Sequence, residues 1–504
     1  MPSTFFGLDI GKTGLYAANA GLLVSGNNMS NEATKGYSRQ VVSMQARTSL
    51  RVYTKYGMVG TGVDVTGIER VRDIYYDSKY RNNNSKLYEN STKYTYGVQI
   101  EDYLNEMNNS DDTAVNTGGF TKLYEQVFST LQELNGRPED MTLRTEFLSS
   151  AQSLGEYLND IQTKLLSLQS EVNLEVSNNV SRINMYTEQI ASLTKQIDTV
   201  ELAGGVANEL RDQRDLILDN LSTIVPVNVT ETKYPNGQND YLVRVGDFTM
   251  VNNYDSHKLE LVSREDKDNQ YDIIGNYDIY YYYDEETHTG TKFDVQSMGL
   301  SGSLRGLLDV RDGNNKDMTS GRDVDYKGIP HYINRIQDFK QAITDAFNEV
   351  HNNGINLYNE STNGVSIFEI TVTGQLKVND DLIKDPALLA TSKSPIQDGI
   401  ADAGLVGDFL DIYDAKLLNN YNASEYLESM VTEVGVSTQK AALFENNYSI
   451  IVENVDLQRM SISGVDGEEE TMNLEKYQEL YELCSRIITV MSECYNKLIN
   501  ETGI

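Results

Sequence analysis

The sequence has no tryptophan and only two cysteines, Cys484 and Cys494, among its 504 residues. Two thiols cannot build a disulfide framework, and without a CxxC pair or a Cys/His cluster they do not indicate zinc. The four histidines are scattered, and no HExxH pattern places two of them on one helix face. We therefore predict neither a metal nor a cofactor, and both cysteines are expected to be ordinary helix residues.

Catalytic signatures are also missing. The sequence contains no Walker loop, no dinucleotide-binding fingerprint and no GxSxG elbow. Carboxylates are so frequent that no pair can be singled out as an acid and a base. Residues 309–317 combine aspartates and asparagines around a glycine, as calcium loops do, but their spacing departs from the EF-hand loop and the twelfth position holds no glutamate. A polar turn after a short helix is the favoured interpretation, and we predict no enzyme.

Basic residues are scarce, with 42 lysines and arginines against 75 acidic residues and a net charge of −33. Such a chain repels phosphate backbones and anionic lipid, so we predict no nucleic-acid partner and no membrane partner. No stretch approaches the roughly 20 apolar residues needed to cross a bilayer. The first residues lack the basic and apolar regions of a secretory signal, so we expect any export to proceed without a cleaved classical signal.

The two ends of the chain carry the clearest periodicity. Residues 4–30 and 472–499 each place apolar or small residues at alternating spacings of three and four, which is the spacing of coiled coils. Acidic residues before the second stretch suit a helix N-terminus. Each stripe needs a partner, either the other stripe or the same helices of neighbouring subunits. The stripes are Leu8, Gly11, Leu15, Ala18, Leu22, Ser25 and Met29, then Leu474, Tyr477, Tyr481, Cys484, Ile488, Met491, Tyr495 and Leu498.

The middle of the chain mixes helices and strands. A long helical region is expected over about 121–202, with a shift of heptad register between residues 172 and 190 that predicts a bend or a break. Shorter helices are expected over 208–222 and 332–350. Alternating and β-branched residues predict strands between 225 and 293 and again over 365–378. The 33 tyrosines could bind sugars or proteins, but for Tyr280–Tyr283 we favour the faces of a half-exposed sheet.

We therefore predict an α+β multidomain protein, with coiled-coil-like terminal helices packed together, long central helices and inserted β-rich domains. Five parts are expected. These are terminal helices at 1–40 and 465–504 forming an inner assembly domain, a mainly helical domain at 41–224 and 424–464 with an extended segment near 50–70, a β-rich insertion at 225–330, a helical segment at 331–354, and a second β-containing insertion at 355–423.

One segment of the first end carries a recognisable motif. Residues 23–40 read LVSGNNMSNEATKGYSRQ and resemble the amino-terminal signature of the flagellar axial proteins, the family of rod, hook and hook-associated subunits. Further matches follow in order at residues 60–82, 207–215, 301–312, 347–354 and 463–478. The form around residues 37–40 and the matches at 207–215 and 463–470 are similar to hook-associated members rather than to hook or rod subunits. The signature residues are Asn27, Asn28, Asn31, Thr34, Gly36, Tyr37, Arg39 and Gln40.

The resemblance implies a structural subunit that joins hook to filament outside the cell, after export through the flagellar type III apparatus. It implies hook subunits, a second junction protein and other copies of the chain in a ring or short tube as partners, and a cytoplasmic export chaperone on the carboxy-terminal helix. The implied assembly surface consists of the terminal helices, at Leu8, Leu15, Leu22, Met29, Leu474, Tyr477, Tyr481, Ile488, Met491 and Leu498. The alternatives are another flagellar axial subunit, an extracellular adhesin or sugar-binding protein using the tyrosine-rich strands, and an enzyme within the insertion.

Overall fold

The computed structural model describes residues 6–51, 57–105, 119–234, 239–316, 323–395, 402–418 and 420–501. The chain folds into two compact units. Unit 1 comprises Met1–Ser85, Arg182–Lys258 and Tyr448–Ile504, and unit 2 comprises Lys86–Ser181 and Leu259–Asn447. Helices and small antiparallel sheets occur in both, so the predicted α+β class is confirmed.

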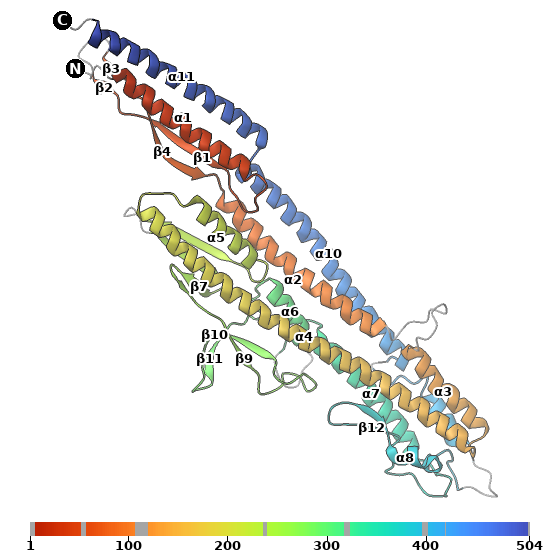
Figure 1. Ribbon diagram of the computed structural model, residues 1–504. Helices are drawn as coiled ribbons and strands as arrows, with labels where there is room; N and C mark the ends of the chain where they lie inside the picture. Colours follow the sequence, from red (N-terminus) through yellow and green to blue (C-terminus); the bar gives the residue numbers. More distant parts are fainter. Residues whose placement is uncertain are drawn as a thin grey trace. The chain divides into compact units, whose positions relative to one another are not determined.

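Helices dominate the described residues (Figure 1). Three of the four boundaries between the two units fall within the helices α2, α4 and α10, and the fourth lies between Lys258 and Leu259. The helices are α1 (Phe6–Ser30), α2 (Ile74–Asn105), α3 (Phe120–Gly136), α4 (Met141–Leu202), α5 (Asn208–Leu221), α6 (Ser303–Asp312), α7 (Ile329–Asn352), α8 (Asp380–Lys384), the 3-10 turn η1 (Pro386–Leu388), α9 (Gly404–Asp411), α10 (Ala423–Ser463) and α11 (Gly467–Asn500).

The strands form small sheets in which every pairing is antiparallel. Unit 1 holds the pairs β1–β4 and β2–β3 and a sheet ordered β5-β6-β7-β8, and unit 2 holds β11-β10-β9 and β12-β13. The strands are β1 (Gln40–Ala46), β2 (Leu50–Arg51), β3 (Met58–Val59), β4 (Val63–Arg70), β5 (Asn228–Lys233), β6 (Asn239–Val245), β7 (Phe248–Asn252), β8 (Asp255–Ser256), β9 (Glu260–Ser263), β10 (Tyr277–Asp284), β11 (Thr289–Lys292), β12 (Phe368–Ile370) and β13 (Leu376–Val378).

The helical region predicted over about 121–202 is interrupted near its start, at residues 137–140. Pro138 cannot donate a backbone hydrogen bond, and the carboxylate of Asp140 accepts the backbone N–H of Thr142 at 2.9 Å. The helix therefore stops at Gly136 and restarts at Met141. From there α4 runs unbroken to Leu202, so of the bend or break predicted between residues 172 and 190, the break does not occur. The apolar stripe changes register there without interrupting the backbone.

The strands predicted between residues 225 and 293 exist, and they contribute to both units. Strands β5–β8 belong to unit 1, and β9–β11 belong to unit 2. Tyr280, Tyr281 and Tyr283 are half-buried on β10 and Tyr282 is exposed, as expected for the faces of a half-exposed sheet.

The core of unit 2 is aromatic. Apolar residues at helical spacing along α7 are almost fully buried, including Phe339 and Phe347. The Phe347 ring lies 5.4 Å from Phe368 and 5.7 Å from Phe409, measured between ring centroids. Phe128 adds a further contact at 6.0 Å. Interlocked rings of this kind bury large apolar areas, so unit 2 has a core that is complete within one chain.

Candidate assembly interface

The terminal helices α1 and α11 lie side by side in unit 1 (Figure 1). Glycines of α1 make the contact. A Cβ added at Gly14 would lie 2.6 Å from the sulfur of Cys484, and one added at Gly21 would lie 2.5 Å from the ring of Tyr477. Gly7 and Gly11 meet α11 in the same way, at Met491 and Ile488 respectively. Because these glycines have no side chain, the two backbones approach closely and the larger side chains of α11 fill the space.

The contact face of α1 includes part of the predicted stripe: Gly11, Ala18 and Ser25 are buried, and Gly11 meets α11. Gly7, Gly14 and Gly21 meet α11, where the prediction placed the leucines next to them. Leu8, Leu15 and Leu22 are half-buried, and Met29 is exposed. The closest approach of the two helices requires the absence of a side chain, so glycines and not the leucines beside them lie at the contact. The buried residues of α1 are Gly11, Ala17, Ala18, Gly21, Val24, Ser25 and Asn28.

The predicted stripe of α11 agrees better with the structure. Tyr477, Cys484, Ile488 and Met491 all face α1. Cys484 is buried in this contact, and burial raises the pKa of its thiol. The remaining predicted residues do not share this contact to the same degree, because Leu474 is half-buried while Tyr481 and Leu498 are exposed.

A second apolar stripe of α11 was not predicted. Leu480, Leu483, Ile487 and Val490 follow one another at spacings of three and four, and they are 36%, 54%, 45% and 56% exposed. At 100° per residue they lie on the side of α11 next to the face that meets α1, whereas Gln478, Glu482 and Thr489 lie on the opposite, polar side. We call these four residues the outer stripe. Its alternating spacing of three and four is visible in the sequence, next to the stripe that begins at Leu474.

The signature segment forms a hydrogen-bonded hub at the end of α1. The side chain of Asn28 is fully buried and all four of its hydrogen-bonding positions are used. Its Nδ2 donates to the carbonyl of Gln40 and to Oε1 of Glu470, both at 2.9 Å. Its Oδ1 accepts from the hydroxyl of Tyr37 at 2.8 Å and the backbone N–H of Gln40 at 3.0 Å. One amide therefore joins α1, β1 and the first turn of α11.

The other signature residues extend this hub. Asn31 donates to the carbonyl and the side-chain oxygen of Asn27, both at 3.0 Å, and accepts from the hydroxyl of Thr34 at 3.2 Å. The carbonyl of Asn27 also accepts the backbone N–H of Asn31 at 3.1 Å, so the side chain of Asn31 adds further hydrogen bonds to the last turn of the helix. Gly36 has a positive φ of 85°, a conformation that favours glycine, in the turn where the chain reverses.

Two further signature residues reach α11 and α5. Arg39 donates to Glu469 at 2.7 Å, and its backbone N–H donates to the carbonyl of Ser463 at 2.8 Å. The side-chain amide of Gln40 donates to Glu209 at 3.0 Å. The signature thus fixes the start of α11 against α1, because the two helices meet the same short loop.

The phenol of Tyr37 is held in its neutral form. Burial, together with the nearby carboxylates of Glu209, Asp212 and Glu470, raises the pKa of Tyr37 to about 12. A neutral hydroxyl can donate to Asn28, so the hub keeps its donor over the whole physiological pH range.

A buried arginine–aspartate cluster lies beside the hub, also within unit 1. It was not predicted. Arg70 lies 2.8 Å from Asp212 and 2.6 Å from Asp215, and Arg81 lies 3.1 Å from Asp215. Burial by itself would raise the pKa of Asp215, but the charges of Arg72, Arg70 and Arg81 outweigh it and hold that pKa well below its usual range. The cluster consists of Arg70, Arg72, Arg81 and Arg459 with Asp77, Asp212, Asp215 and Asp219.

This cluster ties together segments that are far apart in sequence. Arg459 of α10 lies 2.6 Å from Asp219 of α5, and Arg81 of α2 lies 2.7 Å from the same carboxylate. Ser38 of the signature segment donates from its backbone and its hydroxyl to Asp212, at 2.9 and 2.7 Å. Four guanidinium groups face four carboxylates, so the buried charge is balanced. The ion pairs hold β4, α2, α5 and α10 together within unit 1.

The possible calcium loop gives no support for a metal. Asp309 is occupied by Arg305 and Lys93, each at 2.8 Å, and Asp312 is paired with Arg311 at 2.7 Å. Asp317, the last residue of that segment, lies outside the described residues. Within the part of the chain that the structure describes, no three acidic, histidine or cysteine side chains gather as metal ligands would. In the same part, none of the helices is long and apolar enough to cross a membrane.

An exposed apolar stripe beside the paired terminal helices is typical of proteins that assemble with other subunits. A sequence model of the helical domain of the flagellar hook-associated protein FlgK matches residues 100–368, which is more than half of the chain. The chain belongs to this family of flagellar hook-associated proteins, whose members are structural components of the flagellum.

Full-length relatives agree with this assignment. The chain is 29% identical to flagellar hook-associated protein 1 of Bacillus subtilis strain 168, over 100% of this chain and 99% of the relative. It is 24% identical to the protein of that name from Escherichia coli strain K12, over 97% of this chain and 98% of the relative. The fold is similar to the flagellar hook junction protein FlgK from Burkholderia pseudomallei, with a TM-score of 0.59 and 14% identity over 77% of this chain and 100% of the other.

Proposed function

We propose that this chain is the subunit that joins hook to filament, and that α1 and α11 pack with the same helices of neighbouring copies into a ring or short tube. The observation that carries the proposal is the outer stripe of α11. Four apolar side chains at coiled-coil spacing remain exposed after α1 has packed on the adjacent face. Burying a Leu or Val side chain contributes roughly 1.5–3 kcal/mol, so a partner helix on this stripe would stabilise the terminal pair substantially.

The partners follow from family membership and from the same surface. We propose hook subunits below the ring and a second junction protein above it. Before assembly the outer stripe needs protection, and a cytoplasmic export chaperone bound to α11 would supply it. Passage through the flagellar type III apparatus, without a cleaved classical signal, would then place the subunit outside the cell.

Reconstitution on hooks tests the junction role. Purified hooks are incubated with the chain, then with flagellin and a filament cap, and examined by electron microscopy. We expect discrete density at the hook tip, and filament growth only where the chain has been added. Folded chain that leaves the hook tip unchanged would contradict the proposal.

A substitution on the outer stripe separates assembly from folding. Val490→Glu adds a charge at a side chain that is already exposed, so the isolated chain should fold normally while incorporation at the hook tip falls at least about tenfold. Ile488→Asp should block incorporation too, but it is less informative because Ile488 also packs against Gly11 within the chain. Incorporation is measured by quantitative immunoblotting of sedimented hooks.

The matched control is Thr489→Glu, which adds the same charge one residue away on the polar face of α11. It should leave incorporation within about twofold of the unmodified chain, since the polar face has no apolar contact to lose. Equal incorporation of the two variants would remove the outer stripe from the proposed interface.

A further inference from the structure

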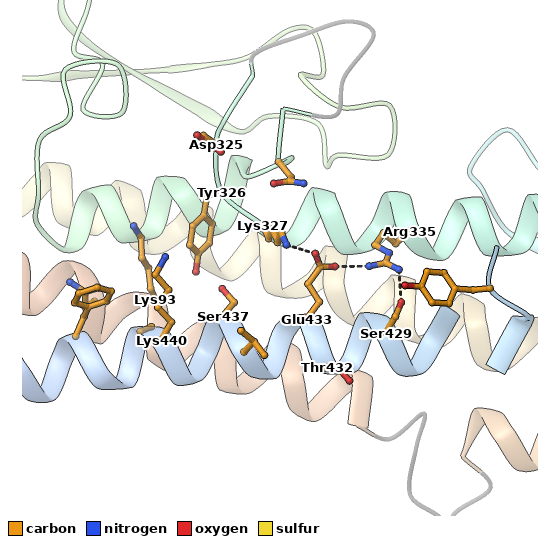
Figure 2. A pocket seen from close by; sticks show the side chains of 16 residues that line it. Lys93, Asp325, Tyr326, Lys327, Arg335, Ser429, Thr432, Glu433, Ser437 and Lys440 are labelled. Atoms are coloured by element: carbon orange, nitrogen blue, oxygen red, sulfur yellow. Dashed lines mark hydrogen bonds and ion pairs between the residues drawn. The ribbon is translucent and has the colours of Figure 1, made fainter. Parts of the chain in front are cut away.

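A groove with a volume of about 920 Å³ runs along α10 within unit 2 (Figure 2). Ser429, Glu433 and Lys440 line it from α10, and Tyr326 and Arg335 face them from the opposite wall. Its lining on α10 extends from Ser429 to Phe444. At 1.5 Å of rise per residue this is roughly 22 Å, the length of about six or seven residues of extended peptide.

The groove is basic, although the chain as a whole carries a net charge of −33. Its lining contains four cationic side chains, Lys93, Lys327, Arg335 and Lys440, against two carboxylates, those of Asp325 and Glu433. Asp325 is already paired with Lys316 at 2.6 Å. Lys93 is likewise paired, with Glu89 at 2.7 Å and with Asp309 at 2.8 Å. Three cations, Lys327, Arg335 and Lys440, then face the single carboxylate of Glu433. A net positive charge therefore remains in the groove of a protein that is otherwise acidic.

The excess positive charge of the groove lies around Glu433. One of its oxygens is bound to Lys327, and the other accepts from Arg335 at 2.5 Å and lies 3.3 Å from His331. Burial would raise the pKa of Glu433, but hydrogen bonds from His331, Lys327 and Arg335 hold it well below its usual range. Lys440 is exposed on the same face of α10 and has no ion-pair partner among the described residues. Lys327, Arg335 and Lys440 therefore share one neutralising carboxylate.

Apolar and aromatic side chains alternate with these charges. Val436 and Phe444 of α10 and Tyr421 are all exposed in the groove, and they are 62%, 43% and 45% accessible. The ring of Tyr326 lies under Lys93, with the ammonium 4.9 Å from its centroid. An occupant must therefore present both carboxylates and apolar side chains along an extended length.

We propose that this groove binds an extended acidic peptide segment of a partner protein, one that alternates carboxylates with apolar side chains. Its carboxylates would pair with Lys440 and with the unused donors of Lys327 and Arg335, and its apolar side chains would cover Val436 and Phe444. Length favours a peptide over a small anion, because the apolar and basic positions are spread over about 22 Å. This site is independent of the terminal-helix interface.

Fluorescence polarisation with the full-length chain tests the site. The probe is a labelled peptide of about seven residues that alternates glutamate and leucine, a length set by the groove. Its counterpart alternates lysine and leucine, and a third peptide replaces leucine with serine. We expect saturable binding of the glutamate–leucine peptide only. The net charge of the chain acts against this result and in favour of the lysine peptide, so selective binding of the acidic peptide requires a local basic site.

Two variants locate the binding on the groove. Lys440→Glu should weaken binding by about tenfold, because it replaces an attractive charge with a repulsive one. Phe444→Ser should weaken it through the apolar wall without changing the charge. The control is Lys122→Glu on α3, an exposed residue outside the lining of the groove that undergoes the same charge change.

The outcomes are distinct. Loss of affinity in Lys440→Glu and Phe444→Ser, with Lys122→Glu within about twofold of the unmodified chain, supports the proposal. Absence of saturable binding by the acidic peptide, equal binding of the serine peptide, or equal effects of the two lysine reversals would each overturn it. Circular dichroism verifies that each variant keeps its helices.

Discussion

The terminal helices of unit 1 and the core of unit 2 bury their apolar residues in opposite ways. Phe347 is 1% exposed and is surrounded by other rings of the same chain. Along α11, Cys484 and Glu470 are the buried residues, and the residues that contact α1 are otherwise half-exposed. One region is complete within a single chain, and the other has apolar surface left for another molecule.

The two regions also differ in what determines how their helices pack. Unit 2 depends on side-chain volume, whereas the terminal pair depends on glycines that permit close approach and on a polar hub that fixes how the helices meet. The glycines bring the two helices together along several turns, and the hydrogen bonds of the hub fix their orientation. Such an interface suits helices that must hold one geometry and still accept neighbours.

The largest expected effect lies in the aromatic core. Phe347→Ala should lower the free energy of unfolding of unit 2 by about 3–5 kcal/mol, because it removes a buried ring and leaves a cavity. Urea denaturation followed by hydrogen exchange of α7 measures the loss. Tyr358→Ala, at an exposed ring, is the control and should change stability by no more than about 0.5 kcal/mol. Equal effects would contradict the claim that unit 2 is complete within one chain.

The arginine–aspartate cluster should give the next largest effect. Asp215→Asn should destabilise unit 1 by about 3 kcal/mol near neutral pH, because Arg70 and Arg81 each lose a buried partner. Hydrogen exchange of α5 and α2 reports the change.

The pH dependence of this variant is a stricter test. The pKa of Asp215 is lower in the folded chain than its unfolded value of about 3.9, so its contribution is present above that pH and is lost as pH falls through the folded pKa. The stability difference between the unmodified chain and Asp215→Asn should therefore shrink below about pH 4. If the difference in free energy of unfolding between the two chains stays constant down to about pH 2, Asp215 does not act through its charge.

The smallest effect compares two glycines of α1. Gly21→Ala should destabilise the contact between α1 and α11 by about 1–2 kcal/mol, because its methyl group would collide with the ring of Tyr477. Gly26→Ala meets nothing within 4 Å and should stabilise α1 by about 0.5–1 kcal/mol through helix propensity. Exchange rates of α1 and α11 amides measure both changes. The same sign for both variants would contradict a close contact made by glycines.

Much of the fold could be predicted from the sequence because its periodic signals are local. The terminal helices, α5, α7 and the strands of residues 225–293 follow from spacing and composition. The break at 137–140 could also have been predicted, since Pro138 marks it. Continuity of α4 through residues 172–190 could not, because a change of register in the stripe can be absorbed by packing as well as by a bend.

The site was predictable only in part. The signature segment resembled a known family, and its residues do gather at the end of α1. The contact face of α1 was predicted in part: it included Gly11 but left out Gly14 and Gly21, which carry no hydrophobic signal, in favour of Leu15 and Leu22 beside them. The arginine–aspartate cluster was missed because charged residues are usually exposed, and its members come from β4, the turn before α2, α2, α5 and α10, segments that only tertiary structure brings together.

Hydrogen exchange of the terminal helices, before and after assembly, tests most directly whether their burial is completed by other subunits. Amides of α1, α11 and α7 are followed by mass spectrometry in the isolated chain and in the chain bound to purified hooks. We expect α1 and α11 to exchange much faster than α7 in the isolated chain and to become protected on the hook, with α7 unchanged. Terminal helices that are already as protected as α7 in the isolated chain would contradict the account.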